Sequence, residues 1–144
     1  MHLNRGVEYG IEGLTYLARA GNNQSTLPRE VSRATSIPET FLSKIVQRLV
    51  RSGLVRSRRG FRGGFLLARP ASQITLREVI EALQRPIYSP VRQAAPAKDF
   101  TGRAQKTPQQ VLARAQSRVR AVFDEITVAD LAGGGASAPV GTRP

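Results

Sequence analysis

Residues 36–67 read SIPETFLSKIVQRLVRSGLVRSRRGFRGGFLL, and the rest of the chain is best understood from this stretch. Its first half has helical periodicity, because apolar residues recur as pairs every four positions. These apolar positions are Phe41, Leu42, Ile45, Val46, Leu49 and Val50. Ser36 and Glu39 have the spacing of a capping box, and Gly53 stands where a helix end is expected. The pattern predicts an amphipathic helix that begins after Ser36 and ends near Gly53.

The second half of the stretch predicts a β-hairpin. Leu54-Val55 and Phe65–Leu67 are short strand-like runs, and the tip 58–64 consists of Arg and Gly apart from Phe61. Glycines at a tip allow positive φ and a close approach of the backbone to a ligand. Arginines present forked donors to phosphates and base edges. No acidic residue occurs between Lys44 and Arg69, so helix and hairpin together indicate a winged helix-turn-helix that binds double-stranded DNA.

The segments before this stretch complete the motif. Residues 4–20 have helical periodicity, residues 22–26 form a polar loop, and residues 27–34 predict a short helix with Pro28 in its first turn. A short helix, a tight turn and a two-faced helix form a helix-turn-helix, whose second helix enters the major groove.

The segment after the hairpin predicts one more short helix. Thr75 and Glu78 have capping-box spacing, and Ile74 and Val79 stand at hydrophobic-staple positions. Leu76, Val79, Ile80 and Leu83 form its apolar side, and this helix should end before Pro86. Residues 85–106 are then poor in apolar residues and read as a loop, of the long kind that is either functional or disordered.

A long helix is predicted from Thr107 to about Ile126. Nothing nearby in the sequence is large enough to bury its apolar stripe. A second copy of the same helix would cover it and give a two-fold dimer; alternatively, the helix folds back onto its own domain. The positions assigned to the dimer contact are Val111, Leu112, Ala115, Val119, Val122, Phe123 and Ile126. Residues 132–144 lack core residues and predict a disordered tail.

Composition narrows the class of partner. The chain has 144 residues, with 22 Lys and Arg against 10 Asp and Glu, for a formal charge of +12. Such a charge favours polyanions. Nucleic acid is favoured over a membrane surface, because no strongly amphipathic basic helix with aromatic anchors is present. No apolar run approaches the roughly 20 residues of a membrane span, and no signal-peptide pattern begins the chain, so we expect a soluble cytoplasmic protein.

Composition also narrows the chemistry. Cysteine is absent and His2 is the one histidine, which argues against thiolate catalysis and against a His-based catalytic or zinc site. No paired-carboxylate constellation suggests an enzyme, and no metal or cofactor is expected. The main alternative to a DNA-binding regulator is a winged-helix module that binds protein or RNA, with the basic hairpin serving only solubility.

The motifs together resemble the Rrf2 family of bacterial transcription regulators. The matching pieces are Leu3-x-x-Gly6-x-x-Tyr9-Gly10, Ile37-x-x-x-Phe41-Leu42, Leu49-x-x-Ser52-Gly53-Leu54-Val55, Arg59-Gly60-x-x-Gly63-Gly64-Phe65-x-Leu67-Ala68-Arg69-Pro70, Ile74-Thr75-Leu76-x-Glu78-Val79-Ile80-Glu81-Ala82 and Ile126-Thr127-Val128-Ala129-Asp130-Leu131. The resemblance implies a mostly α protein with a small β-hairpin wing. It implies a winged helix-turn-helix in residues 1–84, a possible effector region in 85–106 and a dimerisation helix in 107–131.

The resemblance also implies a homodimer that binds a palindromic operator and usually represses. The assigned DNA contacts are Glu39, Thr40, Ser43, Lys44, Gln47 and Arg48 on the helix, and Arg58, Arg59, Phe61, Arg62 and Gly63 on the wing. For Glu39 a plain capping role competes with base readout. For Lys44, Arg48 and Arg51 a solvated helix face is the alternative. Phe61 would either wedge against a sugar or shield the hairpin.

One departure from the family bears on regulation. Cluster-binding members carry cysteines in the loop that corresponds to residues 85–106, and this chain has none. Because an iron–sulfur cluster needs thiolate ligands, no cluster is expected. The remaining options for an effector are a small anion or metabolite held by Arg92, Lys98 or Arg103, or a partner protein that docks on the dimer.

Overall fold

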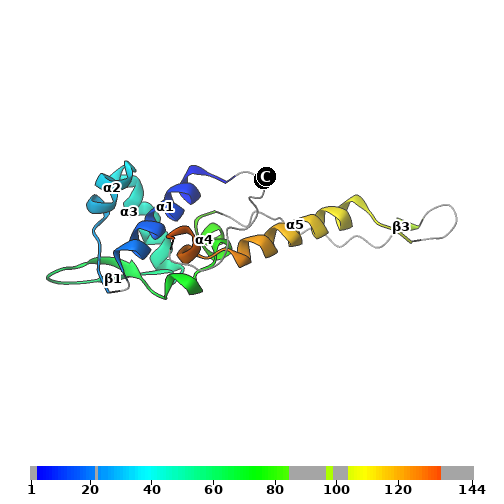
Figure 1. Cartoon of the computed structure of the whole chain (residues 1–144). Coiled ribbons are helices and arrows are strands. Elements are labelled where there is room, and N and C mark those ends of the chain that lie inside the picture. Colours follow the sequence, from blue (N-terminus) through cyan, green and yellow to red (C-terminus); the bar gives the residue numbers. More distant parts are fainter. Residues whose placement is uncertain (1–2, 22, 85–96, 99–103, 134–144) are drawn as a thin grey trace.

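The structure is a computed structural model that describes residues 3–21, 23–84, 97–98 and 104–133. Figure 1 shows a helical body with a hairpin reaching out on one side and one long helix projecting on the other. The helices are α1 (Arg5–Ala20), α2 (Pro28–Thr35), α3 (Glu39–Arg51), α4 (Leu76–Leu83), α5 (Pro108–Glu125) and α6 (Val128–Leu131), with a 3-10 turn η1 at Ala71–Gln73. The hairpin strands are β1 (Val55–Arg58) and β2 (Gly64–Leu67), and a second short pair is β3 (Ala97–Lys98) with β4 (Ala104–Gln105). The predicted fold class, mostly α with a small hairpin wing, is confirmed.

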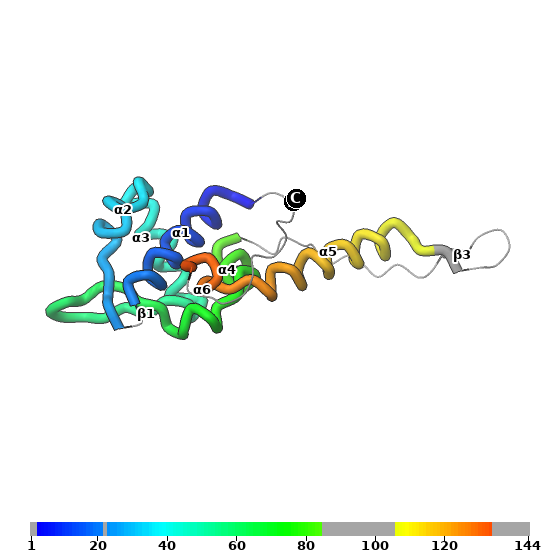
Figure 2. The backbone as a smooth tube through the Cα atoms, viewed as in Figure 1, coloured from blue at the N-terminus to red at the C-terminus, as the bar shows by residue number. Residues whose placement is uncertain are grey.

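The core lies where α1, α3 and α4 meet. Val7 and Leu14 of α1 and Val79 of α4 are fully buried, and Leu49 of α3 is 2% exposed. Helix α6 packs against α1 and the 3-10 turn η1, where the tube in Figure 2 returns to the body, and its Val128 joins this core. A segment late in the chain, α6, therefore completes the core that the first part of the chain begins.

The turn between α2 and α3 differs from the prediction. Ser36 does not begin α3; it adopts the left-handed conformation (φ 64°) and ends α2, where its N–H donates to the Ser32 carbonyl at 3.0 Å. This tight reversal lets Ile37, 1% exposed, enter the core. Pro38 is then the N-cap of α3 and makes no side-chain cap. The predicted capping box of Ser36 and Glu39 is therefore wrong, because Ser36 is needed to end the preceding helix.

The C-terminus of α3 agrees with the prediction. Gly53 has φ 75°, its N–H donates to the Val50 carbonyl at 3.0 Å, and the Leu54 N–H donates to the Leu49 carbonyl at 3.0 Å. These two bonds form a Schellman motif, with Leu49 and Leu54 both buried beside it. The motif reverses the chain and starts the wing at a defined angle from α3.

The wing is braced by a residue from the loop before α2. Residues 55–58 pair with 67–64 in antiparallel register. Thr26 and Phe65 exchange N–H···O bonds of 2.8 Å in both directions, so Thr26 acts as a one-residue third strand. A Cβ at Gly64 would lie 2.8 Å from the Thr26 carbonyl oxygen, so this approach requires glycine. The prediction of a plain polar loop for residues 22–26 is therefore wrong at Thr26, which is buried.

Helix α4 begins with the predicted capping box. The Thr75 hydroxyl accepts from the Glu78 N–H at 3.2 Å, and the Glu78 carboxylate accepts from the Thr75 N–H at 2.9 Å. The staple residues Ile74 and Val79 are fully buried. The returning chain docks at the same place, because the Leu76 N–H donates to the Ile126 carbonyl at 2.8 Å. The sequence interpretation missed α6, although Thr127 and Asp130 form a further capping box there.

Helix α5 projects from the body. Strand β3 lies near the end of α5 that is farther from the body (Figure 1). Thr107 caps it together with Gln110, as expected for its start. At its other end Asp124 accepts from the Arg77 guanidinium, and Arg120 lies 3.3 Å from Glu81. Within the region predicted as a loop, 97–98 pairs with 105–104; residues 85–96 and 99–103, and the predicted tail 134–144, lie outside the described residues. In the described part of the chain, no helix has the length and apolarity needed to cross a membrane.

Candidate nucleic-acid interface

The polar side of α3 is one continuous exposed face. Glu39, Thr40, Lys44, Gln47 and Arg48 are exposed, and Ser43 is half-buried among them. The opposite side carries the buried residues Leu42, Ile45 and Leu49. The Ser43 hydroxyl donates to the Glu39 carbonyl at 3.0 Å, so its oxygen lone pairs remain available to accept. The structure thus brings the assigned helix residues together on one surface.

Arg48 has a partner inside the protein. Its Nη1 donates to the Leu83 carbonyl at 3.1 Å, at the last residue of α4. A cation at a helix C-terminus is favourable, because the unsatisfied carbonyls there carry partial negative charge. Arg48 therefore ties α3 to α4, in addition to any contact it makes with DNA.

The wing places its basic residues at a projecting end. Arg58, Arg59, Phe61 and Arg62 are exposed, and Gly63 is half-buried. Arg58 Nη1 donates to the Asn23 carbonyl at 3.4 Å, and the Ser25 hydroxyl donates to the Arg62 carbonyl. The loop before α2 thus holds the wing from one side.

The tip backbone is tightly folded. Gly60 and Arg62 have positive φ angles of 93° and 62°, and the Gly63 N–H donates to the Gly60 carbonyl at 2.9 Å. A Cβ at Gly63 would lie 2.8 Å from the carbonyl oxygens of both Arg58 and Gly60. The tip is therefore a defined turn with its side chains directed outward, and Gly63 contributes backbone shape.

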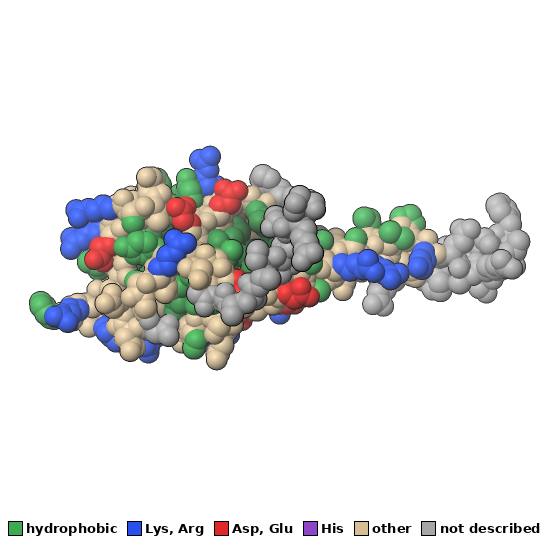
Figure 3. Space-filling view, in the orientation of Figure 1, with side chains coloured by type: hydrophobic (Ala, Val, Ile, Leu, Met, Phe, Trp, Pro, Cys, Tyr) green, Lys and Arg blue, Asp and Glu red, His purple; other side chains and the backbone are tan. Residues whose placement is uncertain are grey.

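Phe61 is the most exposed large apolar side chain of the described residues, at 94%. Its ring centre lies 5.9 Å from the Arg62 guanidinium carbon, which is within cation–π range. Figure 3 shows a hydrophobic patch beside basic side chains at the end of the hairpin. The alternative in which Phe61 shields the hairpin does not agree with this exposure.

A hollow beside α3 extends the basic face toward α1. It has a volume of about 440 Å³, and its lining includes Arg5, Lys44 and Arg48 around the apolar side chains of Phe41 and Leu83. Arg5 lies outside the motifs from which DNA contacts were assigned. The glycines Gly6, Gly10 and Gly13 were a weak sequence signal for a close approach to DNA near Asn4 and Arg5, with close helix packing as the other interpretation. The packing of α1 on α3 brings Arg5 to the same surface.

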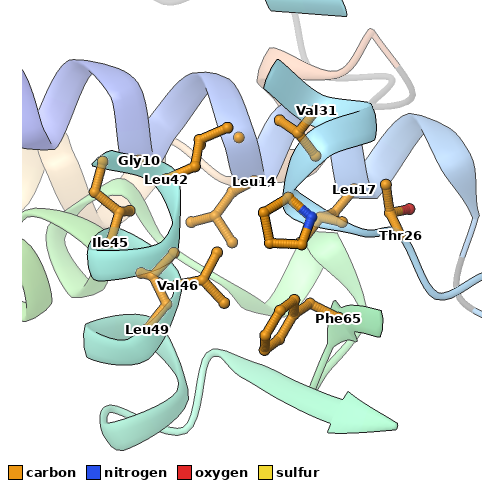
Figure 4. A pocket seen from close by; sticks show the side chains of 12 residues that line it. Gly10, Leu14, Leu17, Thr26, Val31, Leu42, Ile45, Val46, Leu49 and Phe65 are labelled. Carbon is orange, nitrogen blue, oxygen red and sulfur yellow. The ribbon is translucent and has the colours of Figure 1, made fainter. Parts of the chain in front are cut away.

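A second hollow lies on the buried side of α3 (Figure 4). Apolar side chains from α1, α2, α3 and the wing point into it: Leu14, Val31, Leu42, Val46 and Phe65. Its volume is about 20 Å³, which is room for about one water molecule. It is therefore a packing gap and is too small for an effector.

The family is established by comparison with known proteins. The model of the Rrf2 family, described as iron-dependent transcriptional regulators, matches residues 3–134. The chain belongs to the Rrf2 family. The resemblance seen in the sequence is confirmed, and the protein is a DNA-binding transcriptional regulator. The family and its solved members are transcriptional regulators and not enzymes.

Individual relatives agree with the family. The chain is 33% identical over 135 residues to a Mycobacterium tuberculosis protein named as an HTH-type transcriptional regulator, covering 93% of this chain and 83% of that protein. It is 43% identical over 84 residues to the Rhizobium meliloti protein aau3, covering 58% of this chain. That match spans 54% of the length of aau3, so the chain spans about half of this relative.

Solved structures agree on the fold. CymR, the global cysteine regulator of B. subtilis, superposes with a TM-score of 0.74 at 25% identity, covering 94% of this chain and 98% of CymR. IscR of T. potens superposes with a TM-score of 0.72 at 22% identity, covering 99% of this chain and 94% of IscR. These likenesses support the same winged-helix architecture for this Rrf2 chain.

The iron dependence in the family's description does not fit the side chains of this chain. The sequence has no cysteine and one histidine, His2, so it offers no thiolate set for a cluster. The described residues contain no group of three or more His, Cys, Asp or Glu that could hold a metal ion. Of the side chains considered for an effector, Arg92 and Arg103 lie outside the described residues, and only the backbone of Lys98 is described.

The residues assigned to dimerisation fall into two groups. Val111, Leu112 and Val122 are 53%, 58% and 43% exposed, and Ala115 is also exposed. Val119 is half-buried, Phe123 packs against the core of its own domain, and Ile126 is the C-cap of α5. Figure 3 shows hydrophobic side chains uncovered on the projecting helix. The helix thus folds back onto its domain at one end and leaves its apolar stripe open along the rest.

Proposed function

We propose that this Rrf2 regulator is a homodimeric repressor that binds a palindromic operator. One observation carries the proposal: the basic face of α3 and the wing lies on the body of the protein, while α5 holds an apolar stripe away from that body. The first surface suits DNA and the second suits another copy of α5. A protein that uses both would place two DNA-reading faces in fixed relation.

The dimer follows from the exposure of the stripe. Val111 and Leu112 are more than half exposed on a helix with no buried side chain. Exposed apolar area is costly in water, at about 25 cal/mol per Å². A two-fold related α5 would bury the same positions on both chains, because an isologous interface uses one patch twice. Two copies of α3 would then meet two half-sites, separated by about one helical turn of DNA or a multiple of it.

Within the interface, side-chain chemistry determines which residues we assign to the bases and which to the phosphates. Thr40, Ser43 and Gln47 carry neutral donors and acceptors that suit base edges, while Lys44 and Arg59 carry charges that suit phosphates. Glu39 stands in the first turn of α3, where a carboxylate is favoured by the helix dipole. We assign it to this local role rather than to base readout.

The proposed organisation of the chain follows the same surfaces. Residues 1–84 form the DNA-reading unit, 85–106 the effector region and 132–144 a tail. Residues 107–131 form the dimerisation unit, whose last helix, α6, also packs into the core of the DNA-reading unit. The effector would be a small anion, a metabolite or a partner protein. It must bind the DNA-competent and incompetent states with different affinity, since otherwise it shifts no equilibrium. Repression requires only that the dimer occupies the promoter, in the cytoplasm where bacterial DNA lies.

The test is selection of duplexes from a random-sequence pool, followed by footprinting and a salt series. We expect a palindromic protected site and a linear fall of log affinity with log salt, at about −0.9 per phosphate contacted. Occupancy of a promoter carrying the site should lower transcription in a reconstituted reaction. An affinity that stays flat as salt rises, or protection of one half-site only, would contradict the proposal.

A further inference from the structure

We propose that Phe61 is an apolar wedge, which the wing inserts into the minor groove of the operator so that the stack of bases opens at one step. The inference rests on the proposed function, since it concerns how the same DNA-reading face works. The tip of the wing combines a large, almost fully exposed apolar side chain with basic neighbours.

The first observation is the exposure of the ring. Phe61 is 94% exposed, whereas Phe65 on the same hairpin is half-buried and packs against the core. Phe41, at 40% exposed, makes an edge-on contact with Tyr9 at 5.3 Å between ring centres. Phe61 is the aromatic residue in the described region of the chain that contributes almost nothing to the fold. An exposed aromatic side chain at the tip of the hairpin is well placed to contact a binding partner.

The second observation is that the tip is held in shape before any partner arrives. The backbone turns through positive φ at Gly60 and Arg62, and the crowding at Gly63 leaves no room for a Cβ. The Ser25 hydroxyl and the Arg58 guanidinium add bonds between the wing and the loop that precedes α2. Because the tip of the wing is ordered before DNA binds, insertion of the Phe61 ring costs less conformational entropy than it would from a flexible tip.

The third observation is the charge around the ring. Arg59 and Arg62 flank Phe61 in the sequence, and the Arg62 guanidinium lies 5.9 Å from the ring centre. Arginines are attracted into a narrow minor groove, where the negative potential is enhanced. An apolar side chain carried in with them can separate adjacent base pairs, most readily at a flexible pyrimidine–purine step.

Groove geometry favours the minor groove for the wing. The major groove, about 12 Å wide, admits a helix such as α3, and the minor groove is about half as wide and admits a thinner element. The grooves alternate along the duplex, so a hairpin that projects beside a helix seated in the major groove meets the adjacent minor groove. The tip has two strands, with Gly60 directly before Phe61 and Gly63 two residues after it, so its backbone is narrow enough to enter.

The probe is a duplex selected by the wild-type protein from a random-sequence pool, with 2-aminopurine at each step under the wing in turn and dyes at both ends. We expect the wild type to raise 2-aminopurine fluorescence at one step and to shorten the end-to-end distance by bending. Phe61→Ala should abolish both signals and weaken binding about tenfold. Phe61→Leu should partly restore each signal, because a leucine can also act as a wedge.

The salt series separates the wedge from the phosphate contacts. Phe61→Ala removes no charge, so its log–log salt slope should equal that of the wild type, whereas Arg59→Ala should reduce the slope by about one phosphate contact. The melting temperature should not change in either variant, since both side chains are exposed. Equal bending, fluorescence and affinity for wild type and Phe61→Ala would overturn the wedge while leaving the regulator intact. A pool from which the wild type selects no duplex would instead overturn the proposed function.

Discussion

At the scale of single residues, the wing carries exposed side chains that are available to bind DNA and contribute little to the stability of the fold. Arg59 is exposed, and among the described residues it has no hydrogen bond or ion pair. Exposed substitutions of this kind change stability by less than about 0.5 kcal/mol. The side chain is therefore available to DNA without a structural duty.

We expect Arg59→Ala to weaken operator binding at an unchanged melting temperature. The matched control is Arg114→Ala, which removes the same charge from an exposed position on α5, away from α3 and the wing. Fluorescence anisotropy with labelled operator, together with thermal melts, measures both quantities. If Arg114→Ala weakens binding as much as Arg59→Ala, the wing contributes only net charge.

Gly10 shows the opposite case, in which a residue acts through packing alone. An added Cβ would lie 2.0 Å from Leu83 Cδ1, and Leu83 is 3% exposed. At Gly13 the nearest atom would be Leu42 Cδ2 at 3.8 Å, an ordinary contact. The two glycines lie on the same helix, so they share the gain of about 1 kcal/mol that alanine brings to a helix interior.

We expect Gly10→Ala to lower the free energy of unfolding by roughly 1–2 kcal/mol, because overpacking of a tight core outweighs the gain in helix propensity. Gly13→Ala should be neutral or more stable by up to about 1 kcal/mol. Urea denaturation of both variants measures the difference. Equal stability of the two variants would show that Leu83 moves aside freely.

At the scale of elements, α4 is the junction of the molecule. Its first turn holds Glu78, which bonds to Thr75 and to Arg69 at 2.9 Å. Burial by itself raises the pKa of Glu78. The hydrogen bonds from the Thr75 N–H and from Arg69, together with the charge of Arg69, outweigh burial, so the pKa lies below its ordinary value of 4.5.

The sign of the pH effect follows from this direction. A carboxylate with a pKa lowered by folding stabilises the folded state above its unfolded pKa of 4.5, and that contribution is lost as the pH falls through the lower folded value. We expect Glu78→Gln to be less stable than the wild type at pH 7, with a gap that narrows below pH 4.5. Denaturant midpoints measured from pH 7 to pH 3 test this. A gap that stays constant over the range would show that the charge of Glu78 is irrelevant.

At the scale of the whole molecule, α5 joins two copies in the proposed dimer. Leu112 and Val122 are 58% and 43% exposed in one chain, so an aspartate at either position should not unfold it. In a dimer the same aspartates would bury charge in an apolar seam, which is strongly unfavourable.

We therefore expect the double variant Leu112→Asp, Val122→Asp to be monomeric and to lose tight operator binding. Ser117→Asp is the control. Ser117 is exposed on the opposite side of α5, so this substitution adds a negative charge to the same helix outside the apolar stripe. Sedimentation and footprinting of both proteins give the answer. A double variant that remains dimeric would place the interface elsewhere.

The whole chain also sets the kind of signal it can receive. With no cysteine and a single histidine, it has no ligands for an iron–sulfur cluster. We expect protein purified without air to be colourless, and its operator affinity to be unchanged by oxygen, nitric oxide or iron chelation. Absorption spectra and binding curves before and after each treatment test this. A visible charge-transfer band, or release of DNA on brief oxidation, would reveal ligands that residue types do not suggest.

The sequence by itself determined the features that depend on near neighbours. The apolar stripe of α3, the Thr75–Glu78 cap and the Gly53 turn are each formed by residues within a few positions of one another. Periodicity and capping therefore predicted these elements, and the spacing of motifs was enough to indicate the family. The exposed polar face of α3 followed as the complement of its buried face.

The tertiary structure decided the features that depend on residues far apart in the chain. Ser36 had the spacing of an N-cap, yet the need to bury Ile37 made it the end of α2. Thr26 joined the wing only because the fold carries it to Phe65, and Arg48 found the α4 carbonyl in the same way. The physical reason is that a local pattern states which bonds a residue can make, while packing of the whole core selects the partner it meets.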